Sequence, residues 1–99
     1  KEQYSLGDRK FSQADLERAD LENIFLSRVE MIKANLNYAH LKNADLSDAN
    51  LTESSLINAE LDKAHLSGIN LSKANLAQAN FNQSIIKQIL VKLVWRKLA

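Results

Sequence analysis

The sequence predicts an all-β solenoid, because one five-residue phrase recurs without a gap from Ala14 to Gln83. The phrase reads Ala-Asp-Leu-Glu-Arg at residues 14–18 and Ala-Asn-Leu-Ala-Gln at residues 74–78. We call its leucine position i. Position i is Leu from residue 16 to residue 81 except at Met31 and Phe81, and position i−2 is Ala from residue 14 to residue 79 except at Ile24, Val29, Ser54 and Ile69.

A period of five fits neither a regular helix nor a flat strand. A helix turns by about 100° per residue, so each leucine would lie about 140° from the previous one and no apolar stripe would form. In a strand, an odd period would move each leucine to the opposite face of the sheet. A short extended piece with i−2 and i inside, followed by a corner, satisfies both positions. Corners in one sense make a coil, and stacked coils bury Leu and Ala.

The tandem phrase A-(D/N)-L-x-x resembles the pentapeptide repeat family over about 75 of the 99 residues. The corners follow from the period, whereas the resemblance implies the handedness and the number of sides. It implies a right-handed quadrilateral β-helix with one repeat per side and four repeats per coil. The stretch from Tyr4 to Phe11 is similar to the lead-in of many cyanobacterial members.

The chain divides into three predicted segments. Residues 1–8 form an N-terminal cap, residues 9–83 form the β-helix of fifteen repeats, and residues 84–99 form a C-terminal helix with Ser84 as its N-cap. We expect short strands centred on the i residues. Residues twenty apart should then stack at about 4.7–4.9 Å, placing the leucines in four buried columns. Position i+2 falls at the corner, and its Asn23, Asn43, Asn58 and Gly68 suit a turn with positive φ.

Composition sets limits on the chemistry. Aromatic residues make up only 6% of the chain and cysteine is absent, which predicts an aliphatic core and excludes thiolate sites. The net charge of +1 is uneven, because residues 14–83 are net −4 and residues 84–99 are net +4. We expect no transmembrane segment, since the apolar run Ile89–Trp95 is far too short to span a bilayer. The cytoplasm is the favoured compartment; a thylakoid lumen or periplasm would follow if a signal peptide had been removed.

No catalytic, cofactor-binding or metal site is predicted, so we do not expect an enzyme. The two histidines, His40 and His65, are both at position i−1 but 25 residues apart, which places them on neighbouring sides rather than in one column. His40 should lie between Asp20 and Glu60, twenty residues before and after it. Paired carboxylates on an outward surface without a cleft are solvated rather than acid–base pairs. Three charged columns should form ion pairs: Lys33/Glu53/Lys73, Glu22/Lys42/Asp62 and Arg28/Asp48.

Two sets of apolar residues are candidate interface positions. Phe25, Ile32, Tyr38 and Ile57 should point outward; scattered exposed apolar side chains are normal, and this interpretation is favoured over a contiguous binding patch. In the C-terminal helix, one apolar stripe suffices to cover the end of the coil. The residues outside that stripe predict a homodimer through the helix or, alternatively, a helix packed along one side of the solenoid; they are Val91, Val94, Trp95 and Leu98.

The leading functional hypothesis is a non-catalytic protein–protein interaction or scaffolding module with an unknown protein partner. The resemblance agrees, since most members of the family have no known activity. One alternative is a DNA-mimic inhibitor of a topoisomerase such as gyrase, as in the quinolone-resistance branch of the family. Lysines interleaved among the acids disfavour it. A second alternative is membrane-surface attachment through the basic C-terminal helix. Direct nucleic-acid binding is disfavoured, because the basic residues do not share a column with aromatic residues.

Overall fold

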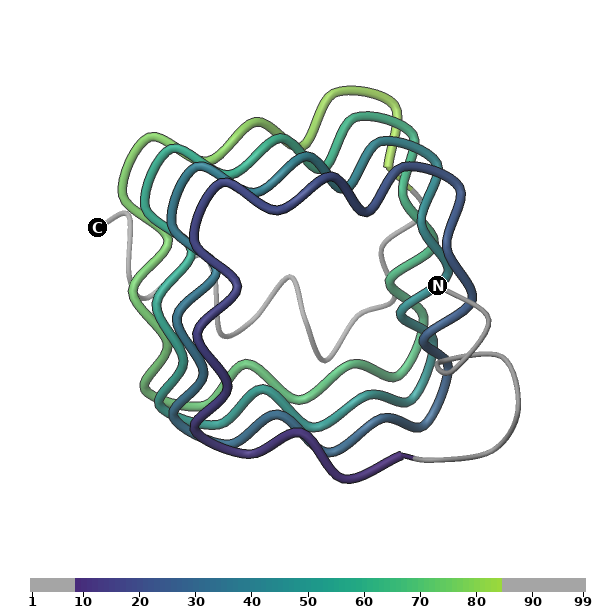
Figure 1. The fold of residues 1–99 in the computed structure, drawn as a ribbon. Coiled ribbons are helices and arrows are strands. Elements are labelled where there is room, and N and C mark those ends of the chain that lie inside the picture. The colour runs from purple at the N-terminus through teal and green to yellow at the C-terminus, as the bar shows by residue number, and fades with distance from the viewer. Residues whose placement is uncertain (1–8, 85–99) are drawn as a thin grey trace.

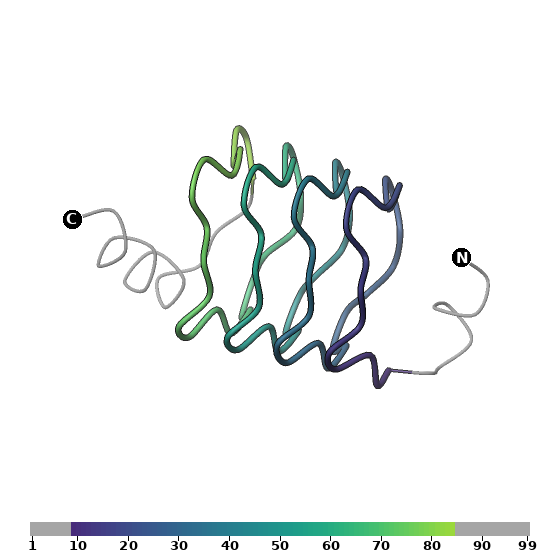
Figure 2. The same ribbon diagram turned by 60° about the vertical axis from the view of Figure 1, so that its left-hand side comes forward.

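The computed structural model describes residues 9–84, and residues 1–8 and 85–99 lie outside the description. The described chain winds into a coil with four sides, one five-residue repeat to each side (Figure 1). Seen from the N-terminal end, the path runs clockwise as it recedes, so the coil is right-handed (Figures 1 and 2). The predicted β-helix is therefore present, whereas the predicted N-terminal cap and C-terminal helix fall outside the described residues.

Parallel bridges between successive coils replace long strands. Each bridge joins two i−1 residues twenty apart, as in His40 with Glu60. Within residues 9–84 no residue belongs to a helix or to an extended strand. The prediction of short strands centred on the i residues is therefore wrong. The bridges fall one residue earlier, because the i residue already leads into the turn and leaves only one residue in ladder geometry.

The coils are joined by a regular ladder of main-chain hydrogen bonds. In the second coil, the Leu36 amide donates to the Ser55 carbonyl oxygen at 2.7 Å and the Tyr38 amide donates to the Ile57 carbonyl oxygen at 2.9 Å. The Ser55 amide in turn donates to the Ala34 carbonyl oxygen at 2.9 Å. The same three bonds recur at nineteen-, nineteen- and twenty-one-residue separations along the chain. This ladder stacks the coils nearly in register (Figure 2).

Each side ends in a tight turn with one residue in the left-handed region. The Ala39 amide donates to the Leu36 carbonyl oxygen at 3.1 Å, and the same contact closes every other described turn. Every i+2 residue from Gln13 to Gln83 has φ between 58° and 71°. A positive φ at the second central residue alone is the pattern of a type II turn. The sequence predicted this conformation at Asn23, Asn43, Asn58 and Gly68; the structure extends it to Arg, Lys, Asp, Glu, Gln and Tyr.

The interior of the coil is filled by the i and i−2 side chains. The central leucines, such as Leu36 and Leu46, have 0% exposure, and the alanines at i−2 pack in the same core cluster. Phe11, Leu16 and Phe81 are only partly buried, because they belong to the first and last coils. The predicted leucine columns are thus confirmed, with full burial limited to the central coils. Since five residues make one side, only two in five can reach this core, and the other three form the surface.

Four sides can now be named by their i residues. Side 1 contains positions 11, 31, 51 and 71, side 2 contains 16, 36, 56 and 76, side 3 contains 21, 41, 61 and 81, and side 4 contains 26, 46 and 66. Ser84, predicted as a helix N-cap, continues this pattern. Its amide donates to the Phe81 carbonyl oxygen at 3.0 Å, and its hydroxyl donates to the Leu61 carbonyl oxygen at 2.6 Å. The repeat conformation therefore extends through Ser84.

Candidate interaction surface

The i−1 residues have a structural role that explains their chemistry. Where i−1 is Asp or Asn, its Oδ1 accepts a hydrogen bond from the amide two residues later; Asn50 Oδ1, for example, accepts from the Thr52 amide at 3.1 Å. The bond satisfies an amide that the ladder between coils does not use. It recurs at Asp15, Asp20, Asn35, Asp45, Asn70, Asn75 and Asn80. The Asp and Asn side chains at position i−1 therefore stabilise the turns. The outward orientation that allows this bond also places the Asp carboxylates on the surface.

The two isoleucines at i+1 use a different acceptor. The i−1 residue two positions before each isoleucine is Glu30 or Ser55 rather than Asp or Asn, so the isoleucine amides donate to side chains of the preceding coil. The Ile32 amide donates to Ser12 Oγ at 3.2 Å, and the Ile57 amide donates to Asn37 Oδ1 at 2.9 Å. Ile32 and Ile57 lie at outward positions as predicted, but both are half-buried.

His40 lies in the predicted column between two carboxylates. Its main chain forms β-bridges with Asp20 in the preceding coil and with Glu60 in the following coil, and its Nδ1 is 3.1 Å from Glu60 Oε1. His65 bridges to Asp45 on the neighbouring side. Among the described residues, no three His, Asp or Glu side chains are arranged to hold a metal ion. The histidines therefore belong to separate columns, and the structure does not bring them together.

The charged columns form fewer ion pairs than the sequence predicted. Lys33 Nζ lies 3.8 Å from Glu53 Oε1, which confirms one pair. The column Glu22/Lys42/Asp62 and the pair Arg28/Asp48 show no ion pair in the described repeats, so those predictions are wrong. The Asp48 carboxylate occupies the space where a Cβ of Gly68 would lie, on the side of its coil away from Arg28. Because Gly68 has no side chain, the Asp48 carboxylate lies in that space instead of pairing with Arg28.

Two aromatic side chains are well exposed, as predicted. Phe25 on side 4 has 63% of its surface exposed, and Tyr38 at the end of side 2 has 42%. The Arg18 guanidinium lies over the Tyr38 ring, 4.4 Å from its centroid, and also within 4.0 Å of Glu17. Phe25 and Tyr38 are not on the same side, so the structure does not join the predicted apolar residues into one patch. The remaining predicted interface residues, Val91, Val94, Trp95 and Leu98, lie outside the description.

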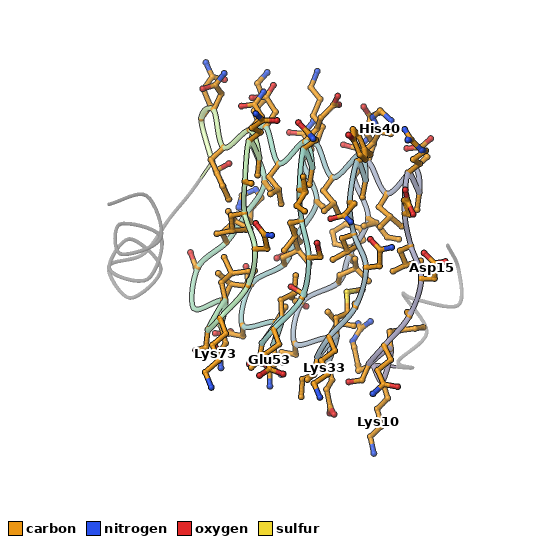
Figure 3. All side chains as sticks on the ribbon, turned by 90° about the vertical axis from the view of Figure 1, so that its left-hand side faces the viewer. Lys10, Asp15, Lys33, His40, Glu53 and Lys73 are labelled. Atoms are coloured by element: carbon orange, nitrogen blue, oxygen red, sulfur yellow. The ribbon has the colours of Figure 1, made fainter. Side chains whose placement is uncertain are left out.

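Sequence reasoning missed an uncharged surface on side 2. We define it as the outward residues of the second, third and fourth coils on that side. Figure 3 views this side face on, with Lys33, Glu53 and Lys73 along one edge and His40 beyond the other. The uncharged surface comprises Asn35, Asn37, Tyr38, Ser55, Ile57, Asn58, Asn75, Ala77 and Gln78.

Writing the sequence in rows of twenty would have shown this surface, because the absence of charge appears only when columns are aligned. The linear sequence hides it, since charged residues of the other three sides separate residues 34–38, 54–58 and 74–78. In space Lys33, Glu53 and Lys73 form a border beside these three stretches (Figure 3). A charge-depleted centre surrounded by a polar rim is typical of protein–protein interfaces.

No helix in residues 9–84 meets the length and apolarity needed to cross a bilayer.

Comparison with known proteins identifies the family to which these repeats belong. The family described as "Pentapeptide repeats (8 copies)" matches residues 10–48 and 49–88. No curated protein matches the sequence. Among solved structures, the pentapeptide repeat protein alr5209 from Nostoc PCC 7120 is 32% identical, with 93% of this chain and 87% of that chain covered and a TM-score of 0.48.

Two further cyanobacterial structures are similar. The pentapeptide repeat protein Rfr23 from Cyanothece 51142 is 29% identical over 79% of this chain, with a TM-score of 0.48. HetL from Nostoc sp. PCC 7120, a pentapeptide repeat protein involved in heterocyst differentiation regulation, is 24% identical over 78% of this chain, also with a TM-score of 0.48. This chain spans 60% of Rfr23 and 48% of HetL. On the match of its repeats, which covers most of its length, the chain belongs to the pentapeptide repeat family.

Proposed function

We propose that the chain is a non-catalytic protein–protein interaction module that binds through the flat sides of its solenoid. The observation that carries the proposal is the division of positions: i and i−2 fill the interior, and i−1, i+1 and i+2 form stacked outward columns. Recognition chemistry on the described repeats is therefore restricted to broad sides. Small-molecule sites are concave and largely enclose their ligand, whereas broad sides fit a protein.

The module is rigid, which suits a display role. Every described turn is closed by a main-chain hydrogen bond, and each coil is tied to the next on all four sides. Outward side chains are therefore held at fixed spacing before a partner arrives. Such preorganisation reduces the entropy lost on binding.

A side-resolved binding experiment tests the proposal. The third coil offers a matched set, because its four i+1 residues are all half-buried and occupy equivalent turn positions: Thr52, Ile57, Asp62 and Ser67. Each is replaced by Arg in the full chain. Partners are then recovered by cross-linking in cells that naturally contain the protein, with urea denaturation of each variant as the control for folding.

We expect one partner to be lost from one variant, or from two at neighbouring corners, and retained by the others. If all four correctly folded variants recover the same proteins in the same amounts as the parent chain, binding through the sides is refuted. Turnover of a small molecule by the purified chain would refute the non-catalytic assignment separately.

The two alternatives receive less support. A DNA mimic needs a continuous acidic surface, but Lys42, Lys63 and Lys73 lie among the acids of the described coils. A supercoiling assay with gyrase tests this alternative directly. Membrane attachment and homodimerisation through residues 84–99 remain predictions from sequence. Liposome co-sedimentation of the full chain and of a chain ending at residue 83 shows whether membrane binding requires residues 84–99.

A further inference from the structure

The uncharged surface on side 2 has the anatomy of a protein interface. Charged residues make up 25% of the chain, yet none of the nine residues of this surface is charged. Its centre carries the half-buried Ile57, and Tyr38, whose ring has the Arg18 guanidinium over one face, is 42% exposed. A charged edge, Lys33, Glu53 and Lys73, runs beside it (Figure 3). Interface cores are depleted in charge and enriched in tyrosine, and their rims are polar.

Hydrogen bonds hold the polar side chains of the uncharged surface in place. Asn37 Oδ1 accepts from the Ser55 hydroxyl at 2.6 Å and from the Ile57 amide at 2.9 Å. The Asn37 amide donates to Asn35 Oδ1 at 3.0 Å, and the Ala77 amide donates to Asn75 Oδ1 at 3.1 Å. These groups already have partners within the chain, so covering them with another surface leaves fewer buried polar groups unsatisfied.

We propose that the uncharged surface binds the same surface of a second copy of the chain, with the two solenoid axes antiparallel. Side 2 has four coils, marked at its centre line by Asp15, Asn35, Ser55 and Asn75. A two-fold axis between the second and third coils, perpendicular to the solenoid axis, overlaps all four. It places Lys33 of each copy opposite Glu53 of the other, and Asp15 opposite Asn75.

Charge complementarity selects this arrangement over its parallel counterpart. The antiparallel pairing joins Lys33 to Glu53 twice and opposes no like charges. A parallel pairing about an axis along the solenoid would place Asp15 of one copy against Asp15 of the other. Like charges directly opposed across an interface are unfavourable, and closed two-fold dimers are the commonest homo-oligomers.

The size of side 2 sets the expected strength. Four coils at about 4.8 Å spacing give a face about 20 Å tall, which is small for a stable interface. We therefore expect a weak dimer that forms as the concentration rises from micromolar to millimolar. This inference goes beyond the proposed function, because it concerns the purified chain alone and does not depend on any other partner.

A charge swap tests the pairing in the full chain by sedimentation equilibrium. Lys33→Glu opposes Glu53 of the second copy and should raise the dissociation constant by more than about tenfold. The double variant Lys33→Glu/Glu53→Lys restores opposite charges both within the chain and between copies, so it should restore the dimer. Urea denaturation of each variant shows whether folding is unaffected.

A matched pair of substitutions tests the location. Ile57→Lys places a charge at the centre of the uncharged surface, whereas Ser67→Lys places one at the equivalent turn position on side 4. Ile57→Lys should abolish the dimer and Ser67→Lys should leave it intact.

Cross-linking tests the direction, since the natural chain has no cysteine. Chains carrying Asp15→Cys and chains carrying Asn75→Cys are treated with a short bis-maleimide, separately and mixed. Antiparallel dimers give a product only in the mixture. Products from each variant alone would show parallel pairing and overturn the geometry. A monomer at millimolar concentration would overturn the proposal. A dimer unaffected by both Lys33→Glu and Ile57→Lys would also overturn it, because the chains would then associate through another surface.

Discussion

At the scale of single residues, Ser54 is out of keeping with its column. It occupies an i−2 position between Ala34 and Ala74, is 1% exposed, and its hydroxyl has no hydrogen-bond partner. A buried unsatisfied hydroxyl costs about 1–3 kcal/mol. We therefore expect Ser54→Ala to raise the free energy of unfolding by about 1 kcal/mol, measured by urea denaturation.

The neighbouring serine provides the control for that substitution. The Ser55 hydroxyl donates to Asn37 Oδ1 at 2.6 Å, so Ser55→Ala should lower the free energy of unfolding by about 0.5–1.5 kcal/mol. Equal effects of the two substitutions would contradict the assignment of Ser54 as unsatisfied.

The i+2 positions carry a conformational cost that glycine would relieve. Lys63 has φ of 59° and an exposed side chain. The left-handed conformation costs an L residue about 1–2 kcal/mol, which exceeds the extra entropy of about 0.5–1 kcal/mol that glycine loses on folding. Lys63→Gly should therefore stabilise the chain slightly, by up to about 1 kcal/mol. Asp62→Gly, at the preceding position without positive φ, should destabilise it, and the reverse order would contradict the turn assignment.

At the scale of the repeat, stability comes from layers that cannot collapse into one another. Leu46 is 0% exposed and has leucines twenty residues before and after it in its column. Leu46→Ala should cost about 2–5 kcal/mol in urea denaturation, because the ladder holds the coils above and below apart. Leu16→Ala, in the partly buried first coil, should cost clearly less. Equal costs would show that the end coils are packed as tightly as the centre.

The turn bonds of the i−1 residues contribute separately from the core. Asn50 Oδ1 accepts from both the amide and the hydroxyl of Thr52, at 3.1 Å and 2.5 Å. Asn50→Ala removes both bonds and should lower the free energy of unfolding by about 1–2 kcal/mol. Asn50→Asp keeps the acceptor and should lose less. A loss as large for Asp as for Ala would indicate that the amide group matters for another reason.

The repeat period was sufficient to predict the buried positions and the turn position, because both follow from two apolar residues in five. The twenty-residue columns also required the four-sided coil that the family resemblance implied. The period could not predict where the bridges fall, since that depends on main-chain geometry common to all residue types. Nor could it predict which charged columns pair. Lys33 reaches Glu53, but Asp48 lies over Gly68 instead of meeting Arg28, and only the packing of neighbouring side chains decides between these outcomes. The uncharged surface was predictable in principle from aligned columns.

At the scale of the whole molecule, we expect the fold to tolerate changes of length only in steps of five residues. Deleting residues 40–59 removes one coil and joins Ala39 to Glu60, which leaves every later residue on its own side. Deleting residues 40–44 joins Ala39 to Asp45 and keeps the repeat phase, but it moves every later residue to the preceding side. The leucine columns should survive both deletions. The first deletion removes Glu53 and Ser55, and the second moves them to another side from their partners Lys33 and Asn37.

A deletion of three residues, 40–42, has a different consequence, because it joins Ala39 to Asn43 and breaks the phase at one point within the coil. In a solenoid, stability is the sum of repeat and neighbour terms, so losing whole repeats weakens the fold without abolishing it. Losing the phase interrupts the ladder between the coils on either side of the deletion. We expect the two in-phase variants to keep a β-type circular dichroism spectrum and a cooperative urea transition at lower denaturant. The three-residue variant should lose the cooperative transition, and a transition equal to that of the five-residue deletion would show that side-chain stacking does not require the phase of the turns.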